Sequence, residues 1–244
     1  MDPSRRGGGL RRWGPIAALV LGAGLAIAAL SAQTGARADT APLTHAPDGR
    51  ALVLTFSEDF DRTQPAPPGM WGGDHIWRTT FGAGASTDLS SRTIKTNKEV
   101  ELYVDPSLKA SSGQPLGLNP FHEHDGVLDI VANRADPSLQ PAIGGYRFTS
   151  GLITSQPSFS QLYGYVEARV KLVSGKGLWP AIWLLPADGS WPPEIDVMES
   201  IGDPMTAFMT VHSATDKTPG VEVHPSSDGY HSYAVSWDSQ HVVF

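Results

Sequence analysis

The segment that decides the fold is Tyr163-Gly-Tyr-Val-Glu-Ala-Arg-Val-Lys-Leu172, in which apolar and polar side chains alternate. Successive side chains of a β-strand point to opposite faces, so the apolar residues would share one face and the polar residues the other. The apolar face predicts contact with a core. The polar face carries tyrosines beside Glu167 and Arg169, which is typical of ordinary exposed surface and is also suited to a sugar-binding cleft.

Short runs of this kind continue along the chain, separated by Gly, Pro, Asn, Asp and Ser, and no convincing helical stripe interrupts them. Strands are predicted at Leu52–Phe56, Glu99–Val104, Val127–Ala132, Gly151–Thr154, Tyr163–Leu172, Ala181–Leu185, Glu194–Glu199, Met209–His212 and Tyr233–Trp237. The regular turn signals favour one all-β domain, a β-sandwich or jelly roll. A further strand from His241 stops at Phe244 in mid-run, so the domain is expected to be truncated at its C-terminal end.

The N-terminus resembles an export signal, because a basic start precedes an apolar run from Ile16 to Leu30 that is short for a membrane span. Ala36 and Ala38 bracket Arg37 in the pattern that a signal peptidase cleaves. We therefore predict a signal peptide at residues 1–38 and one mature domain at 39–244, exported by the general secretory or the twin-arginine route. The mature protein is expected to be secreted or periplasmic, with no membrane attachment.

Charge and cysteine content narrow the partners of the mature protein. The chain has 18 basic and 25 acidic residues, and removal of residues 1–38 takes away five basic residues and one acid, which leaves 13 against 24 and a net charge of −11. Such a protein has no electrostatic reason to bind nucleic acid, whereas an uncharged glycan would not repel it. With no cysteine, neither disulfides nor thiolate chemistry is available. We expect a monomer that requires no cofactor.

The chemistry is concentrated in Trp191-Pro-Pro-Glu-Ile-Asp-Val-Met-Glu-Ser200, which holds three acids on a predicted strand. Glu194 and Asp196 are two residues apart and share a face, whereas the odd spacing would turn Glu199 to the other face. One extra residue in a β-bulge at Val197 or Met198 would bring all three acids to one side. Like charges aligned in this way raise at least one pKa.

Two carboxylates, one ionised and one protonated, are what glycosidic cleavage needs. Leaning together, Glu194 and Glu199 could reach the separation of about 5–5.5 Å that is typical of retaining enzymes, although the wider inverting separation stays open on geometry alone. Upstream, Trp179 and Trp183 are four residues apart and share one side of an extended segment. Indole rings stack on sugar rings, but paired tryptophans in a β protein are more often packing residues.

These motifs together resemble glycoside hydrolase family 16. The residues that carry the resemblance are Glu-Ile-Asp-Val-Met-Glu, the preceding Trp-Pro-Ala-Ile-Trp-Leu-Leu-Pro, and Tyr-Gly-Tyr-Val-Glu-Ala-Arg-Val-Lys before that. The resemblance implies a concanavalin A-like jelly roll and a retaining endo-β-glycosidase. It also implies that Glu194 is the nucleophile, that Asp196 assists it, and that Glu199 is the general acid/base.

The inserted Met198 resembles the bulged subgroup of the family, which includes laminarinases, so the expected substrate is β-1,3- or β-1,3/1,4-glucan. Weaker matches to substrate-contacting residues of the family fall on Asn97, on the pair Glu167 and Arg169, and on His212. Trp179, Trp183 and Asn97 are the preferred substrate contacts.

Two other functions stay open. The first is a glucan-recognition protein of the same fold without catalysis, although such proteins typically lack one or both motif glutamates. The second is the same chemistry on agar, carrageenan or a bacterial exopolysaccharide.

No metal ligand is predicted among the site residues. The run His122-Glu-His-Asp125 is interpreted as a solvated loop. A structural calcium ion, with Glu58 as a candidate ligand, is left open by the resemblance.

Overall fold

The computed structural model describes residues 16–22, 43–60, 70–71, 76–82, 87–156, 158–215, 220–225 and 227–244. Within these ranges the elements are β1 (Ile16–Gly22), β2 (Met70–Trp71), β3 (Trp77–Arg78), η1 (Lys95–Asn97), β4 (Glu101–Tyr103), β5 (Phe121–His124), β6 (Val127–Ile130), β7 (Asn133–Arg134), η2 (Gln140–Ile143), β8 (Phe148–Ser150), β9 (Leu152–Thr154), β10 (Gly164–Lys171), β11 (Ala181–Pro186), β12 (Glu194–Glu199), β13 (Ala207–His212), β14 (Val221–Val223), β15 (Tyr230–Trp237) and β16 (Val242–Val243). The helices η1 and η2 are short 3₁₀ turns. Within these ranges the regular secondary structure is therefore almost entirely β, as predicted.

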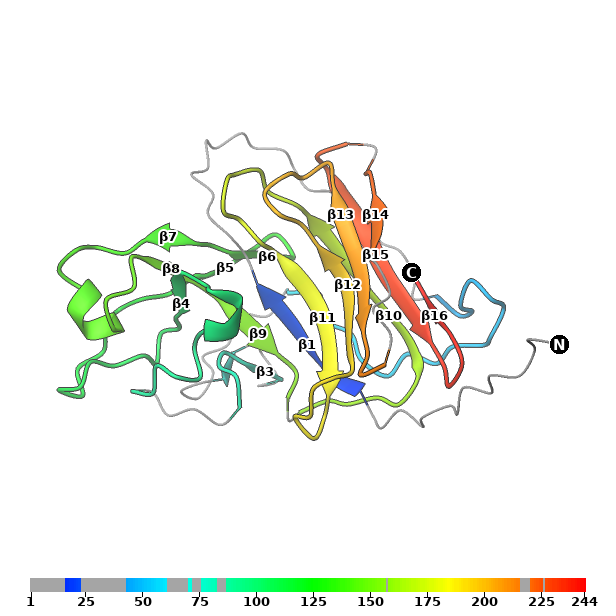
Figure 1. Cartoon of the computed structure of the whole chain (residues 1–244), viewed down its shortest axis with the longest axis horizontal. Helices are drawn as coiled ribbons and strands as arrows, with labels where there is room; N and C mark the ends of the chain where they lie inside the picture. Colours follow the sequence, from blue (N-terminus) through cyan, green and yellow to red (C-terminus); the bar gives the residue numbers. More distant parts are fainter. Residues whose placement is uncertain are drawn as a thin grey trace, which may run out of the picture.

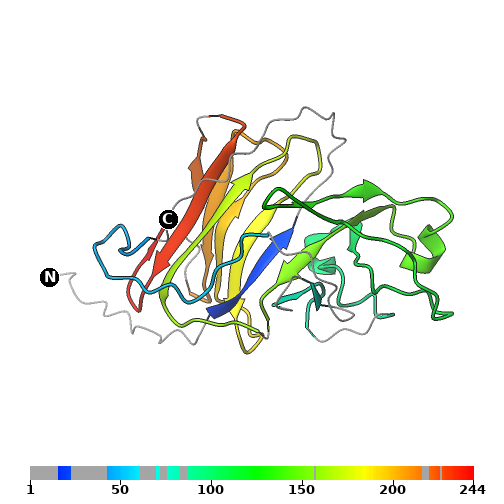
Figure 2. The same ribbon diagram turned by 180° about the vertical axis from the view of Figure 1, so that it is seen from behind.

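Two sheets pack face to face to form the sandwich. The larger sheet has the order β14-β13-β12-β11-β1-β9-β3-β2, and the smaller has the order β10-β15-β16. Figure 1 shows β11, β12 and β13 side by side, and Figure 2 shows β10 and β15 crossing their other face. Apolar side chains from β10, β11, β12, β13 and β15 form the main core between the two sheets. The predicted β-sandwich is confirmed.

The strand β10 behaves as its sequence predicts. It pairs antiparallel with β15 along its whole length, from Gly164 opposite Trp237 to Lys171 opposite Tyr230. Its apolar residues, among them Val166 and Val170, pack against the main core. The polar residues between them must point away from the sandwich interior, because side chains alternate along a strand.

A second region lies beside the sandwich, next to β9 (Figure 1). It contains the three-stranded sheet β4-β8-β7 and the hairpin β5-β6. A buried ion pair connects the segment after β4 to the chain that precedes this region. The Arg92 guanidinium lies 2.6 Å from the Asp105 carboxylate, and the Thr79 hydroxyl donates to the same acid at 2.9 Å. Burial opposes the ionised form of Asp105, but the Arg92 charge and the hydroxyl donors outweigh it and hold the pKa of Asp105 below its ordinary value.

Three elements differ from the sequence prediction. The range Leu52–Phe56 is not a strand, and Val53 in it is 85% exposed, so this apolar run has no sheet to join. The run His122–Asp125 was expected to be a loop, but its first three residues continue β5 from Phe121, with His122 opposite Asp129 of β6. Backbone pairing across a tight hairpin explains the difference, since it does not require apolar side chains.

The third difference concerns the predicted export signal. Ile16–Gly22 forms β1, which pairs with β11 on one side and with β9 on the other. An apolar run suits a strand with neighbours on both edges, which explains how this segment enters the sheet. The predicted cleavage site at 36–38 lies outside the described residues, and the signal peptide stays a prediction. In the part of the chain that the structure describes, no helix is long and apolar enough to span a membrane.

Candidate active site

A bulge in β12 brings the three acids of the site to one face. On the β11 side, Met198 is opposite Ile182 and Asp196 is opposite Trp183, so Val197 has no partner between them. Ile195, Val197 and Met198 all pack into the main core. Glu194, Asp196 and Glu199 therefore lie on the opposite face of the sheet, and the predicted bulge is confirmed.

Each of the two glutamates accepts a hydrogen bond from a different exposed tryptophan. Trp179 Nε1 donates to Glu199 Oε1 at 2.7 Å, and Trp191 Nε1 donates to Glu194 Oε2 at 2.6 Å. Trp179 is 48% exposed and Trp191 is 65% exposed. Solvent-facing indoles that are tied to both carboxylates form a ready platform for sugar rings.

Trp191 is a site residue that the sequence analysis did not single out. It stands three residues before Glu194, in the same quoted motif, and its ring lies 6.4 Å from that of His212. The available signal was an aromatic residue next to the acid-bearing strand. Spacing alone could not show that the chain through Pro192 and Pro193 returns the indole to the acid.

His212 joins the acids from the neighbouring strand β13, where it is opposite Glu194. Its Nε2 lies 2.9 Å from Asp196 Oδ2 and 3.9 Å from Glu194 Oε1. The weak sequence match at this position thus falls on a side chain that contacts the site. Asp196 has only 3% of its side chain exposed, whereas His212 has 42% exposed.

The electrostatics of the site favour protonation of two of its acids. Burial raises the pKa of Asp196, and the negative charges of Glu199 and Glu194 raise it further. Burial also raises the pKa of Glu199, and the charge of Glu194 adds to this, while the Trp179 N–H and the charge of His212 act in the opposite direction. A glutamate whose pKa is raised in this way holds its proton to higher pH than an ordinary glutamate, which suits a group that donates a proton.

Trp183 shares the face of the acids but is mainly a packing residue. It is opposite Asp196 across the β11–β12 pair, so both side chains project to the same side. Its ring packs against Phe81 at 6.3 Å, beside the small cluster of Tyr103 and Leu152. Of the two predicted tryptophans, Trp179 is the one with a hydrogen bond to a site carboxylate, that of Glu199.

Asn97 lies at the end of η1. Its backbone N–H donates to the Ile94 carbonyl, and the Glu99 carboxylate holds this turn by accepting the Ile94 N–H at 2.6 Å.

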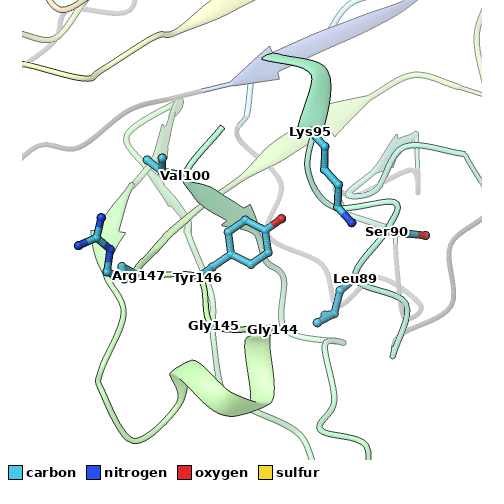
Figure 3. A pocket seen from close by; sticks show the side chains of 8 residues that line it. All are labelled: Leu89, Ser90, Lys95, Val100, Gly144, Gly145, Tyr146 and Arg147. Carbon is cyan, nitrogen blue, oxygen red and sulfur yellow. The ribbon is translucent and has the colours of Figure 1, made fainter. Parts of the chain in front are cut away.

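Next to the turn is an open cavity of about 460 Å³, lined by Leu89, Ser90, Lys95, Val100, Gly144, Gly145, Tyr146 and Arg147. Figure 3 shows the Tyr146 hydroxyl pointing toward Lys95. None of the three site acids lines this cavity, and Asn97 stays a predicted substrate contact.

The structure does not bring Glu167 and Arg169 to the acids. Both lie on β10 of the smaller sheet, on the face that points away from the core. The Glu167 carboxylate accepts the Ser232 hydroxyl at 2.8 Å, and the Arg169 guanidinium lies 4.6 Å from the Tyr230 ring centre. The sandwich core separates this pair from the acids, so the expectation that it lines a cleft with them is corrected.

The candidate calcium ligand Glu58 is engaged by protein donors. Its carboxylate accepts the Phe60 N–H at 2.9 Å and the Trp77 indole N–H at 3.2 Å. These bonds leave lone pairs on a carboxylate that can accept about four. Calcium binding at Glu58 therefore stays a prediction.

A sandwich with paired glutamates on one bulged strand, each held by an exposed indole, is typical of carbohydrate-active proteins of the glycosidase class. Residues 89–244 match the model of glycosyl hydrolases family 16, and the chain belongs to that family. The implied jelly roll is therefore the fold of the chain.

Among curated proteins, an endo-1,3-1,4-beta-glycanase of Rhizobium meliloti is 38% identical over 205 residues, which cover 81% of this chain and 41% of that relative. A beta-1,3-glucan-binding protein of Penaeus monodon is 43% identical over 174 residues, covering 62% of this chain and 44% of that protein. The chain thus spans about two fifths of the length of these relatives. A solved structure of a non-specific endo-beta-1,3(4)-glucanase of the same family superposes with a TM-score of 0.55 at 26% identity, over 76% of this chain and 68% of the other.

Proposed function

We propose that this chain is the catalytic domain of an endo-acting glycoside hydrolase that cleaves β-1,3- or β-1,3/1,4-glucan with retention of configuration. The observation that carries the proposal is the placement of Glu194 and Glu199 on one face of β12, each bound to its own exposed indole. Relatives named as glucanases and glycanases support the substrate class.

In this mechanism, Glu194 attacks the anomeric carbon while Glu199 donates its proton to the departing glycosidic oxygen. Glu199, now ionised, then takes a proton from water, and the resulting hydroxide displaces Glu194 and releases the sugar. The raised pKa of Glu199, which burial causes, supports its role as the proton donor. Trp191 and Trp179 would carry the sugar rings on either side of the scissile bond.

Asp196 and His212 would prepare the nucleophile. Because burial and two neighbouring negative charges raise the pKa of Asp196, this acid would hold a proton and share it with Glu194. That proton removes much of the repulsion between two adjacent carboxylates. His212 Nε2, at 2.9 Å from Asp196 Oδ2, would fix the orientation of the middle acid.

The test is the release of reducing ends from laminarin, mixed-linkage β-glucan, agarose and a charged exopolysaccharide. Glu194→Gln should lower the rate by roughly a thousandfold or more, because the nucleophile is lost. Glu167→Gln is the matched control and should keep full activity, because Glu167 lies on the far side of the sandwich. Equal activity of wild type and Glu194→Gln would refute the assignment.

The second candidate is glucan recognition without hydrolysis, which the similarity to a beta-1,3-glucan-binding protein favours. Retention of both glutamates argues for catalysis instead. Laminarin binding by wild-type protein that releases no reducing ends from any of the four polymers would support recognition. Activity on agarose or on the charged polymer alone would keep the chemistry and change the substrate.

We also propose that residues 1–38 direct export and that the mature protein is a secreted or periplasmic monomer. The basic start, the apolar run and the Ala36-Arg-Ala38 pattern support this. Expression in a bacterial host should release a protein whose first residue is Asp39, as read by mass spectrometry, and whose mass in solution is that of one chain. Cleavage before Asp39 would remove β1, which lies between β9 and β11 in the larger sheet. A retained N-terminus would therefore contradict the proposal and agree with the position of β1 in the sheet.

A further inference from the structure

Three potential metal-ligand atoms converge at one end of the β12–β13 pair. They belong to Glu194, Asp196 and His212, which we call the acid–histidine cluster, and all lie within 4.8 Å of one another. Two are carboxylate oxygens and the third is an imidazole nitrogen. This mixture of ligands suits zinc and related transition metals better than calcium, which takes 6–8 oxygen ligands.

The distances from His212 to the two acids are close to those that a small ion needs. Zinc binds nitrogen and oxygen at about 2.0–2.2 Å, so the ligand atoms of a tetrahedral site lie about 3.3 Å apart. His212 Nε2 is 2.9 Å from Asp196 Oδ2 and 3.9 Å from Glu194 Oε1, which brackets that value. The Glu194 and Asp196 oxygens lie within 4.8 Å of each other, so these two carboxylates would have to approach each other by up to about 1.5 Å to complete three legs of a tetrahedron.

The surroundings of the cluster hold the ligands and leave an approach to them. Trp191 donates its N–H to Glu194 Oε2, which leaves Oε1 facing His212. A hydrogen bond to the second oxygen of a ligating carboxylate is the kind of outer contact that orients metal ligands. His212 is 42% exposed, so an ion could enter from the face where a glucan would bind.

Charge gives the reason for binding. Two carboxylates, one of them nearly fully buried, repel each other unless something positive lies between them. A dication between the two carboxylates would neutralise both of them.

We propose that the acid–histidine cluster binds one Zn²⁺ ion, which blocks the nucleophile and acts as a reversible inhibitor that competes with the glucan. The binding stands on the geometry of the cluster, whereas the inhibition rests on the proposed glucanase function. Zinc would occupy Glu194 Oε1, Asp196 Oδ2 and His212 Nε2, with its fourth position open to water.

Binding is tested by isothermal titration calorimetry of the metal-free full chain with Zn²⁺ in a buffer that does not chelate it. Wild type should bind one ion in a site that Mg²⁺ does not fill, and His212→Gln should weaken that site at least tenfold. The matched control is His124→Gln, because His124 also lies near two carboxylates, at 3.6 Å from Asp125 and 3.0 Å from Asp129. It should leave the cluster's affinity unchanged.

A second variant, Asp196→Asn, should weaken zinc binding in the same way, and circular dichroism of both variants checks that the sandwich is folded. Wild type without a stoichiometric zinc site would overturn the proposal. Equal affinity in wild type and His212→Gln would also overturn it.

Inhibition is tested separately with laminarin. Zinc should raise KM and leave kcat unchanged, and EDTA should restore the original rate. Zinc binding by a protein that cleaves no glycan would retain the metal site and reject the proposed function. A fully active enzyme that binds no zinc would retain the proposed function and reject the metal site.

Discussion

The hydrogen bond from Trp179 to Glu199 should set the alkaline limit of activity. In the proposed mechanism Glu199 must be protonated to act as the general acid, so the alkaline limb of kcat/KM against pH would report the pKa of Glu199 in the free enzyme. The Trp179 N–H stabilises the ionised form and lowers that pKa. Trp179→Phe keeps an aromatic ring and removes the donor, so the pKa of Glu199 should rise and the limb should move to higher pH.

The size of the shift follows from the exposure of the indole. A hydrogen bond to a charged group contributes roughly 1.5–3 kcal/mol. Because Trp179 is 48% exposed, water would replace much of the lost bond. About half of the lower value, or ~0.7 kcal/mol, corresponds to a shift of about 0.5 pH unit at 1.36 kcal/mol per pKa unit.

The assay is initial-rate hydrolysis of laminarin at low substrate concentration, from about pH 4 to pH 9, a range that covers a glutamate with a raised pKa. Trp183→Phe is the control, because its ring packs on Phe81 at 6.3 Å and should not affect the limb. A limb that stays in place in Trp179→Phe, or moves to lower pH, would refute the reasoning.

Three further changes test the fold and the site. Asp196→Asn should raise the stability of the fold at neutral pH. Because the pKa of Asp196 is raised in the folded state, its contribution to the free energy of unfolding is complete only below about pH 3.9 and declines as pH rises. In calorimetry the difference in Tm between variant and wild type should therefore widen from about pH 4 to pH 8, and a constant difference would contradict this. Arg92→Leu leaves Asp105 buried without its cation, so urea unfolding should show that the free energy of unfolding falls by about 3–5 kcal/mol. A fall of less than ~1 kcal/mol would mean that the pair is not buried as described. Deletion of Val197 removes the bulge and leaves Glu194, Asp196 and Glu199 at alternate positions of a regular strand, so all three acids should stay on one face and laminarin hydrolysis should be retained; loss of hydrolysis in a variant that far-ultraviolet circular dichroism shows to be folded would mean that the bulge itself positions the acids.

The sequence predicted the elements whose signals are local. Alternation gave β10 and its core face, and the odd spacing of Glu194 and Glu199 required a bulge that the register confirms. These predictions succeeded because the period of a strand fixes which side chains share a face. The same reasoning placed the three acids together before any partner strand was known.

The remaining features depend on pairing between distant segments. Alternation shows that Glu167 and Arg169 share a face, but only the partner strand β15 shows which sheet carries them. The contact of Trp191 with Glu194 depends on the path of the chain between them. The strand β1 joins β9 and β11 from more than 100 residues away, and its composition fits an export signal equally well.

The two exposed indoles give the protein a spectroscopic reporter of its own site. Indole emission depends on the solvent and hydrogen bonds around the ring, and the Trp179 and Trp191 side chains face solvent while their N–H groups contact the acids. A sugar ring stacked on either one would replace water at its face, whereas Trp77 and Trp237 are buried and would supply a constant background. Stopped-flow fluorescence could therefore separate glucan binding from bond cleavage without any added label.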